Sequence, residues 1–406
     1  MRGKASRREP SAGRPRSALA GAMFLMATSA IGPGFITQTT QFTAQLGAAF
    51  AFAILASVLV DVAVQLNVWR VIGVSGLRAQ DLADRMWSGL GAVLAGIVVL
   101  GGLVFNVGNV AGAGLGLEAL LGLPARWGGA LSAVLAVGVF LSRRAGVAMD
   151  RIVVVLGALM IVLTTYVALV SDPPVGDALR NSVLPERIDL LAITTLIGGT
   201  VGGYITYAGA HRLVDAGVQG VDRVGEISRA AVTGVLLTGA MRVLLFLAVL
   251  GVVSAGHALD PAHPAASAFE AAAGEVGRRV YGLVLWAAAI TSVIGASYTS
   301  VSFFARAGAS DGPRRSAGVV AFIAVSAAIY LAIGTAPVSL LVFAGAFNGI
   351  LLPAGLAVML WIAVGRPDLL GGYRYPRGLI VMGVAGWLVT LYLGARSIAG
   401  LAALLR

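Results

Sequence analysis

The chain consists largely of apolar segments that are long enough to cross a lipid bilayer. Hydrophobic residues make up 58% of its 406 residues and charged residues only 12%, as in polytopic membrane proteins. A helix needs about 20 apolar residues to cross the hydrocarbon core. The sequence therefore predicts an all-α membrane protein with 11 transmembrane helices, at about 18–46, 48–72, 90–121, 127–142, 150–170, 189–211, 230–255, 280–304, 316–333, 337–364 and 377–400.

No stretch of the chain has the composition of a soluble domain. Residues 1–17 are polar and basic, and we expect a disordered cytoplasmic tail there. Residues 18–406 are expected to form a single transmembrane domain. The start also resembles a secretory signal peptide with a cleavage site near Ala27–Ala30. We favour a retained first span, because the apolar segment continues past that site.

Basic residues predict the orientation in the membrane. If the N-terminus is cytoplasmic, 21 of the 29 Lys and Arg residues fall on the inner side, in agreement with the positive-inside rule. We expect the C-terminus outside and a location in the plasma (inner) membrane of a bacterial-type cell. Anionic inner-leaflet lipid is a sufficient partner for the net charge of +11, so no nucleic-acid partner is expected. The sequence leaves the oligomeric state open.

The first span contains a helix-breaking motif at its centre. Ile31 and the Gly32-Pro33-Gly34-Phe35 sequence interrupt an apolar segment; Pro33 removes a backbone donor there, and glycine loosens the helix. Backbone groups released at bilayer depth must be satisfied by protein, water or a bound solute. We therefore predict a discontinuous first helix whose unwound centre lines a binding site.

The sixth span contains a second interruption, at Gly198–Gly203, where four of six residues are glycine. Close helix packing through small residues is one explanation. The alternative is a second broken helix. Because interrupted segments in matching positions of two halves indicate an inverted repeat with a site between them, we favour the latter. The repeats would cover 18–170 and 189–364, and the helix at 377–400 would be an addition.

Polar residues inside the spans are the next candidates. Asp61 lies deep in the second span, where a carboxylate is a functional candidate. A structural role, as the partner of a buried arginine such as Arg242, is an equal alternative. Asn106 and Asn109 share one face of the third span. They either bond helix to helix or belong to a transport pathway.

At the two breaks the sequence resembles the Nramp family of proton-coupled divalent-metal transporters, which belongs to the LeuT-like superfamily. Gly32-Pro33-Gly34-Phe35 aligns with the family's Asp-Pro-Gly-Asn, and Ala44-Gln45-Leu46-Gly47 with its Ala-Gln-Phe-Gly. Gly199–Tyr204 falls on the sixth-helix stretch that ends in Met-Pro-His, and Ser292–Tyr298 resembles an eighth-helix motif. The resemblance covers nearly the whole chain and implies a secondary transporter with a 5+5 inverted repeat.

The ligands of the family are replaced in this chain. By the same alignment, its metal-binding Asp and Asn become Gly32 and Phe35, its Met becomes Gly202 and its His becomes Tyr204. The acids of its proton route become Asn106 and Asn109, which do not titrate. The oxygen donors that remain suit a hard or still-hydrated cation such as Mg²⁺ better than Mn²⁺ or Fe²⁺.

Two substrate classes follow. The first is a divalent cation, as the family resemblance implies. The second is a small organic carboxylate or amino-acid-like solute, which suits the positive start of a helix; Gly32, Gly202 and Gly203 would leave volume, and Phe35 and Tyr204 would form an apolar wall. An enzyme is not expected, since no nucleophile–base pair or metal spacing stands out, and paired broken helices favour alternating access over a standing channel.

We expect the following residues to line the central site: Gly32, Pro33, Gly34, Phe35, Gln38, Thr39, Gly202, Gly203 and Tyr204. Coupling or pathway roles are predicted for Gln41, Asp61, Asn106, Asn109 and Arg242. No catalytic residue and no cofactor is expected, and the absence of cysteine excludes thiolate metal sites.

Overall fold

The computed structural model describes residues 30–304, 313–334 and 337–403, which fold into helices joined by turns and short connecting segments without a strand. The helices are α2 (Pro33–Leu46), η1 (Gly47–Ala49), α3 (Phe50–Ser75), α4 (Ala79–Met86), α5 (Leu90–Leu121), α6 (Ala125–Leu141), α7 (Arg143–Val170), α8 (Val175–Val183), α9 (Leu190–Val201), α10 (Ile205–Asp215), η2 (Val221–Arg223), α11 (Val224–Ser254), α12 (Pro264–Ser302), α13 (Pro313–Ile333), α14 (Pro337–Gly365) and α15 (Arg377–Ala403). The predicted all-α class is confirmed.

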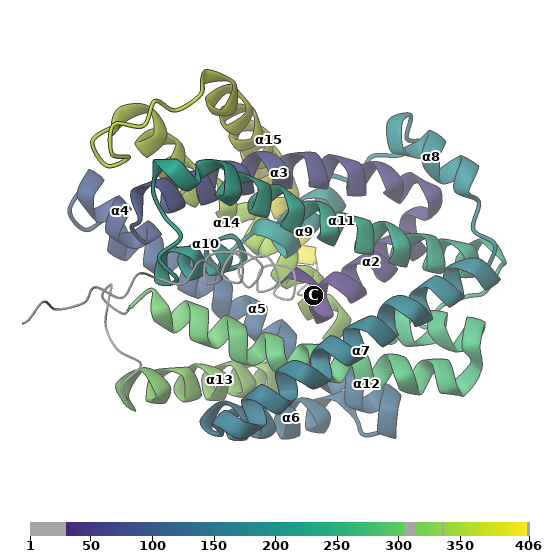
Figure 1. Cartoon of the computed structure of the whole chain (residues 1–406). Helices are drawn as coiled ribbons and strands as arrows, with labels where there is room; N and C mark the ends of the chain where they lie inside the picture. Colours follow the sequence, from purple (N-terminus) through teal and green to yellow (C-terminus); the bar gives the residue numbers. More distant parts are fainter. Residues whose placement is uncertain (1–29, 305–312, 335–336, 404–406) are drawn as a thin grey trace, which may run out of the picture.

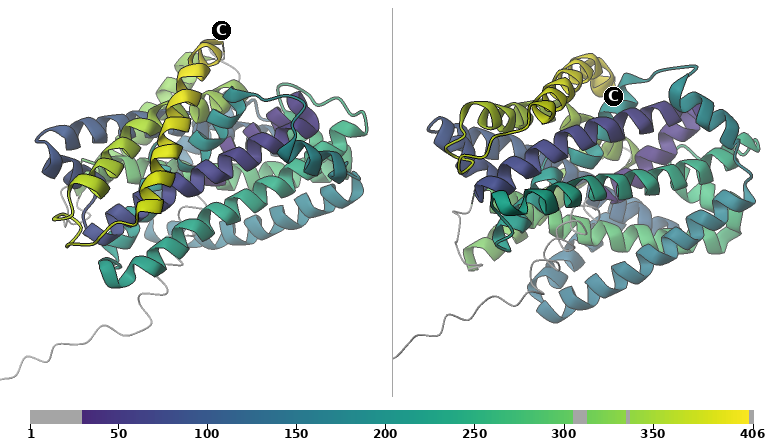
Figure 2. Two further views of the ribbon diagram at one scale, coloured as in Figure 1. Left: turned by 90° about the horizontal axis from the view of Figure 1, so that it is seen from above. Right: turned by 45° about the horizontal axis from the view of Figure 1, so that its top comes forward.

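The long helices run side by side in one bundle, with the short helices α4 and α8 at opposite ends (Figure 1). α2 and α9 are two of the interior helices. α2 contacts α5, α9, α11, α12 and α14, and α9 packs on α3 and α14. α15 crosses the outside of the bundle, against α3, α9 and α14 (Figure 2). The helices predicted to be broken are therefore in the centre.

The structure describes the second break completely and the first from residue 30 onward. α2 begins at Pro33 with Gly32 as its N-cap; the part of the first span before residue 30 lies outside the described residues. In the sixth span, α9 ends at Val201 and α10 begins at Ile205, so Gly202–Tyr204 form the break. This break is shorter than predicted. Gly198 and Gly199 stay helical, because α9 packs tightly on α14 there: a methyl group on Gly198 would overlap backbone atoms of Gly345 and Gly349.

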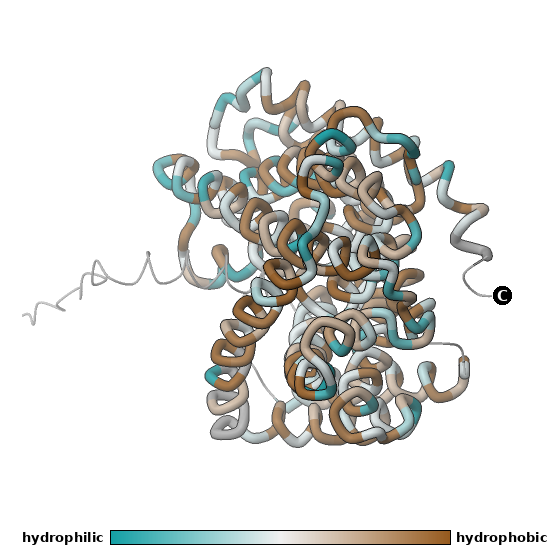
Figure 3. Tube along the Cα trace, turned by 90° about the vertical axis from the view of Figure 1, so that its right-hand side faces the viewer, coloured by the Kyte–Doolittle hydropathy of each residue, from teal (hydrophilic) through white to brown (hydrophobic). Residues whose placement is uncertain are grey.

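Helices occupy the predicted spans wherever the structure describes them. By length and hydropathy, eight helices in the described chain could cross a membrane, or nine with the pair Val154–Val170 and Val175–Val183, which is bent by 104°. That count takes α2 and α3 as one segment and omits α6, which has 17 residues. The number of eleven therefore stays a prediction. Hydrophobic residues follow the helices, and hydrophilic ones gather mainly near the turns (Figure 3).

Close backbone contacts hold the interior helices together. Gly116 of α5 lies against the backbone of Trp286 in α12, where a methyl group would come within 2.6 Å of the Trp286 nitrogen. Small residues allow such contact between helices, which in lipid associate through packing and not through exclusion of water. Many of the 55 glycines are therefore available for packing as well as for the breaks.

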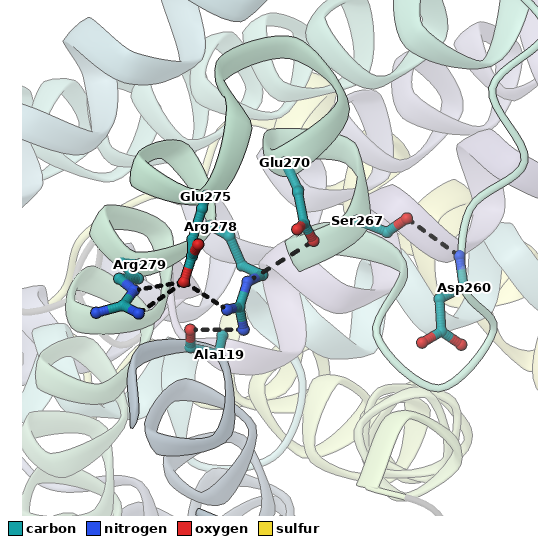
Figure 4. Close-up of polar contacts among 7 residues, drawn as sticks. All are labelled: Ala119, Asp260, Ser267, Glu270, Glu275, Arg278 and Arg279. Atoms are coloured by element: carbon teal, nitrogen blue, oxygen red, sulfur yellow. Dashed lines mark hydrogen bonds and ion pairs between the residues drawn. The ribbon is translucent and has the colours of Figure 1, made fainter. Parts of the chain in front are cut away.

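α12 starts earlier than predicted and bends at Gly274, whose φ is 63°. Arg278, just beyond the bend, lies 3.7 Å from Glu270 before it and 3.4 Å from Glu275, and donates a 3.1 Å hydrogen bond to the Ala119 carbonyl of α5 (Figure 4). One arginine thus joins both arms of the bent helix to the end of α5.

Candidate functional site

Gly32 lies between α5 and α12 at the point where α2 begins. A methyl group on Gly32 would lie 3.0 Å from the Ser292 hydroxyl oxygen and 3.9 Å from the side-chain oxygen of Asn109. Neither the Ser292 hydroxyl nor the Asn109 amide nitrogen has a hydrogen-bond partner among the described residues. First-turn N–H groups of a helix also lack intrahelical partners and carry partial positive charge. Hydrogen-bond donors therefore gather at the start of α2.

Pro33 and Gly34 are buried at the same place. Pro33 packs directly on Gly112 of α5, where a methyl group would overlap the proline ring. The Cα of Gly34 faces the amide of Gln38, since a methyl group there would lie 3.3 Å from the Gln38 nitrogen. The first turn of α2 is thus fixed against its neighbours by shape.

Gln38 and Thr39 were predicted to line the site, and both are fully buried. The Gln38 amide nitrogen donates a 2.8 Å hydrogen bond to the Leu341 carbonyl of α14. Its oxygen has no hydrogen-bond partner in the described part of the chain, and it lies beside Gly199 of α9. The Thr39 hydroxyl donates to the Phe35 carbonyl one turn earlier, at 2.7 Å. Gln41 is only partly buried. Gln38 is thus the residue of this group with a free acceptor in the interior.

The second break contains less space than predicted. A methyl group on Gly202 would lie 2.5 Å from the Gly198 carbonyl oxygen. The side-chain oxygen of Asn348, in α14, fills the space beside Gly203, whose φ is +54°. Asn348 donates to the carbonyls of Gly101 and Ala344, at 3.1 and 2.9 Å. The glycines expected to leave volume instead allow this asparagine and the α14 backbone to approach.

Tyr204 connects the second break to the first. Its ring is 1% exposed and packs edge-on against Phe105, with ring centroids 5.9 Å apart. Its hydroxyl hydrogen-bonds Asn109. Gly32, Asn109 and Tyr204 thus form one continuous contact between the breaks.

A pair of opposite charges lies on the other side of α2. Asp61 of α3 and Arg242 of α11 are 1% and 2% exposed and interact through their charges. The Arg242 guanidinium carbon lies 4.5 Å from the centre of the Phe35 ring, in the first turn of α2. Asp61 also hydrogen-bonds Thr200, in the last turn of α9. The pair therefore contacts both broken helices.

Asn106 has a partner on each side. Its amide nitrogen donates to the hydroxyls of Ser297 in α12 and Ser326 in α13, both at 3.0 Å. These bonds join three helices, so the contacts favour the helix-to-helix role for Asn106. Asn109 differs, since it faces both breaks.

Three site residues were not assigned by sequence reasoning: Ser292, Thr200 and Asn348. Each is a small polar residue inside an apolar span, a signal shared with Thr37, Ser57 and Thr238, which are equally buried. Only the packing partners distinguish them.

An apolar cavity of about 320 Å³ adjoins the first break. Its lining includes Ile31 and Ile36, which flank the broken motif, and Met160, Met241 and Thr291 from α7, α11 and α12. Such a lining suits the apolar part of an organic molecule.

One end of the bundle is closed by polar contacts. Arg78, before α4, forms a 2.8 Å ion pair with Asp215 at the end of α10. The His211 ring accepts a hydrogen bond from the Ala79 N–H at 3.1 Å and packs against Phe303, 5.0 Å away. α4, α10 and the end of α12 are thus held together.

The donor set does not resemble a soft-metal centre. No group of three or more His, Cys, Asp or Glu side chains that could hold a metal ion occurs within 30–304, 313–334 or 337–403. Backbone carbonyls and amide or hydroxyl oxygens are the donors at the breaks.

Helices interrupted at the centre of a membrane bundle, with polar groups gathered at the interruptions, define the class of broken-helix membrane transporters. Comparisons with known proteins identify the family. The family model for natural resistance-associated macrophage protein-like (Nramp) proteins matches residues 23–400. The chain belongs to the Nramp family and is therefore a transporter and not an enzyme.

A membrane protein of Haemophilus influenzae is 48% identical over 382 residues, covering 94% of this chain and 95% of the relative. Among solved structures, a point mutant of the manganese transporter of Eremococcus coleocola has a TM-score of 0.72 at 18% identity, covering 98% of this chain and 89% of the transporter. MhsT in complex with L-phenylalanine has a TM-score of 0.66 at 16% identity, covering 98% and 100% of the two chains. These likenesses confirm the LeuT-like fold.

Proposed function

We propose that this protein is a secondary active transporter of the plasma (inner) membrane, with its N-terminus in the cytoplasm, that carries a small organic carboxylate by alternating access. Residues 18–406 would act as one transport domain, and the substrate would bind at the two helix breaks. The repeats at about 18–170 and 189–364 would move relative to each other around that site.

Arg242 carries the assignment of the substrate class. Its guanidinium is buried over Phe35, and its Nε and Nη2 groups have no hydrogen-bond partner among the described residues. Guanidinium groups bind carboxylates through paired N–H donors. The positive end of α2, the Ser292 hydroxyl and the Asn109 amide add donors nearby. These groups together favour an anion.

The surroundings suit an organic anion better than a bare metal ion. A divalent cation would add two positive charges near a buried guanidinium, and Asp61 is the acid that interacts with this arginine. Charge repulsion is strong where water is excluded. Phe35, Tyr204 and the apolar cavity at Ile31 and Ile36 would contact the carbon skeleton of the substrate.

A metal cation is the second candidate. Membership of the Nramp family supports it, as does the fold shared with the manganese transporter. The free oxygen of Gln38 and the carbonyl end of α9 are the groups that would face a cation. Because all of these donors are oxygens, the site would prefer a hydrated Mg²⁺ over Mn²⁺ or Fe²⁺.

Thermal unfolding of the purified protein in detergent tests the two candidates. The ligands are the sodium salts of lactate, propionate and succinate, L-alanine, and the chlorides of Mg²⁺ and Mn²⁺. A ligand present at a hundredfold excess over its Kd stabilises the folded state by about 2.7 kcal/mol. We expect a carboxylate to raise the melting temperature and Arg242→Gln to abolish this effect.

Two further variants make the result specific. The double variant Asp61→Asn/Arg242→Gln removes both buried charges and so avoids leaving either one alone. Arg126→Gln changes an exposed arginine that stacks on Trp127, and it should leave the ligand effect unchanged. A melting shift with divalent cations alone, kept in Arg242→Gln, would overturn the carboxylate assignment in favour of the second candidate.

A further inference from the structure

Asp61 of α3 and Arg242 of α11 are both buried, on helices that pack against each other, and they form no ion pair in the described structure. One carboxylate oxygen of Asp61 and two guanidinium nitrogens of Arg242 are buried and have no partner among the described residues. Buried charges in proteins are normally paired and fully hydrogen-bonded. This pair is incomplete, which indicates that each group interacts with something else during the transport cycle.

Charge balance determines what Asp61 and Arg242 each bind during the transport cycle. With Asp61 ionised, the two residues are neutral together. A substrate carboxylate on Arg242 would add a negative charge and leave the Asp61 carboxylate without its countercharge. An uncompensated buried ion costs several kcal/mol, and such groups take up or release a proton instead.

We propose that Asp61 binds one proton each time a substrate carboxylate binds Arg242, so that substrate and proton move together. This inference rests on the proposed function. The proton comes from water and ends on the Asp61 carboxyl. The net charge of the site is then zero both without substrate, where ionised Asp61 balances Arg242, and with it, where the substrate carboxylate balances Arg242. Release of the carboxylate restores the Asp61–Arg242 interaction and expels the proton.

No other charged group on the described helices around Asp61 competes for this role. Arg70, on α3 itself, hydrogen-bonds Ser228 and Tyr373. Three helices that pack on α3, namely α2, α9 and α14, carry no acidic or basic side chain within their described residues. Their neighbour α10 carries His211, Arg212 and Asp215, which belong to the closed end of the bundle with Arg78. The other charges on helices packed against α3 are Glu226 and Arg229 in the first turns of α11, Asp177 and Arg180 on α8, and Arg377 and Arg396 on α15. None of these is among the groups that interact with Asp61, whose charge partner is Arg242.

Calorimetric titration counts the protons. Lactate and propionate are titrated into the purified protein at pH 7 in phosphate and in Tris, which differ in ionisation enthalpy. The difference in observed heat gives the number of protons taken up per bound carboxylate. We expect a value close to one for the native protein. Asp61→Asn should still bind, with proton uptake reduced to zero, and Glu275→Gln, an exposed acid, should behave as the native protein does.

The outcomes separate the two proposals. Carboxylate binding without proton uptake by the native protein would overturn the coupling and leave the proposed function standing. Unchanged proton uptake in Asp61→Asn would assign the proton to another group and would also overturn the inference. Absence of binding by either carboxylate, together with a melting shift from divalent cations, would overturn the proposed function and this inference with it. The count on the native protein does not depend on whether Asp61→Asn folds.

Discussion

The side-chain nitrogen of Gln38 donates a 2.8 Å hydrogen bond to the backbone carbonyl of Leu341, and so joins α2 to α14 near the first break. The same amide lies against Gly345 of α14 and Gly199 of α9, where added methyl groups would overlap it. One fully buried side chain of α2 thus packs against two other interior helices, α9 and α14.

Replacing Gln38 with Leu should therefore destabilise the protein. The substitution removes the hydrogen bond to Leu341 and places a branched side chain between two glycines. We expect the free energy of unfolding to fall by about 1–2 kcal/mol, measured by denaturant unfolding in detergent. Gln41→Leu, on the same helix but only partly buried, is the matched control and should change it by less than about 0.5 kcal/mol. Equal effects of both variants would contradict this role of Gln38.

The glycines of the second break lead to a different expectation from the one that the sequence suggested. A methyl group on Gly202 would lie 2.5 Å from the Gly198 carbonyl, so Gly202→Ala should lower the melting temperature and the yield of monodisperse protein. Gly295→Ala is the matched control, because the space beside Gly295 is open in the described structure. There, alanine should be neutral or stabilising by up to about 1 kcal/mol, since it favours helix. A Gly202→Ala protein as stable as Gly295→Ala would show that the second break has spare volume after all.

The fold could be predicted from the sequence largely because the bilayer permits few structures. Apolar runs of sufficient length are expected to be helices, and Pro33 between two glycines disfavours an unbroken one. The extent of the second break could not be predicted. Gly198 and Gly203 look alike in the sequence, yet one is helical against α14 and the other has φ of +54°. The difference arises from tertiary packing, which a glycine count does not contain.

Stability should also respond to pH through Asp81, in the first turn of α4 outside the spans. Partial burial is the main cause that raises its pKa above the usual value, and Arg78 opposes it. A raised pKa in the folded state means that ionised Asp81 destabilises the fold, and that this penalty disappears as pH falls below about 4. Asp81→Asn should therefore raise the melting temperature at pH 7 and leave it nearly unchanged below about pH 4. Asp222→Asn, at an exposed aspartate, should show no such difference, and the same response in both variants would contradict the prediction.

The candidate site was predicted in part. The sequence identified Gly32, Phe35 and Tyr204 through the breaks, and Asp61 and Arg242 as charges inside spans. It left open whether Asp61 acts in transport or pairs with Arg242. The structure shows the two charges interacting but incompletely paired, an arrangement that neither alternative described. Ser292 and Thr200 were not assigned because buried hydroxyls commonly bond to their own helix, as Thr200 does with Leu196.

Gly32→Asp distinguishes the two substrate classes at a single position, since it restores the acid that the Nramp motif carries there. The new side chain would start 3.0 Å from the Ser292 hydroxyl, which can rotate, and close to Asn109. We expect its negative charge to weaken carboxylate binding at least tenfold, equivalent to about 1.4 kcal/mol, and to produce a melting shift with Mn²⁺ or Mg²⁺. Gly32→Asn has nearly the same size without the charge, and it should keep most of the carboxylate affinity. If Gly32→Asn reduces affinity as much as Gly32→Asp does, the effect is steric. If neither variant changes it, the start of α2 does not contact the substrate.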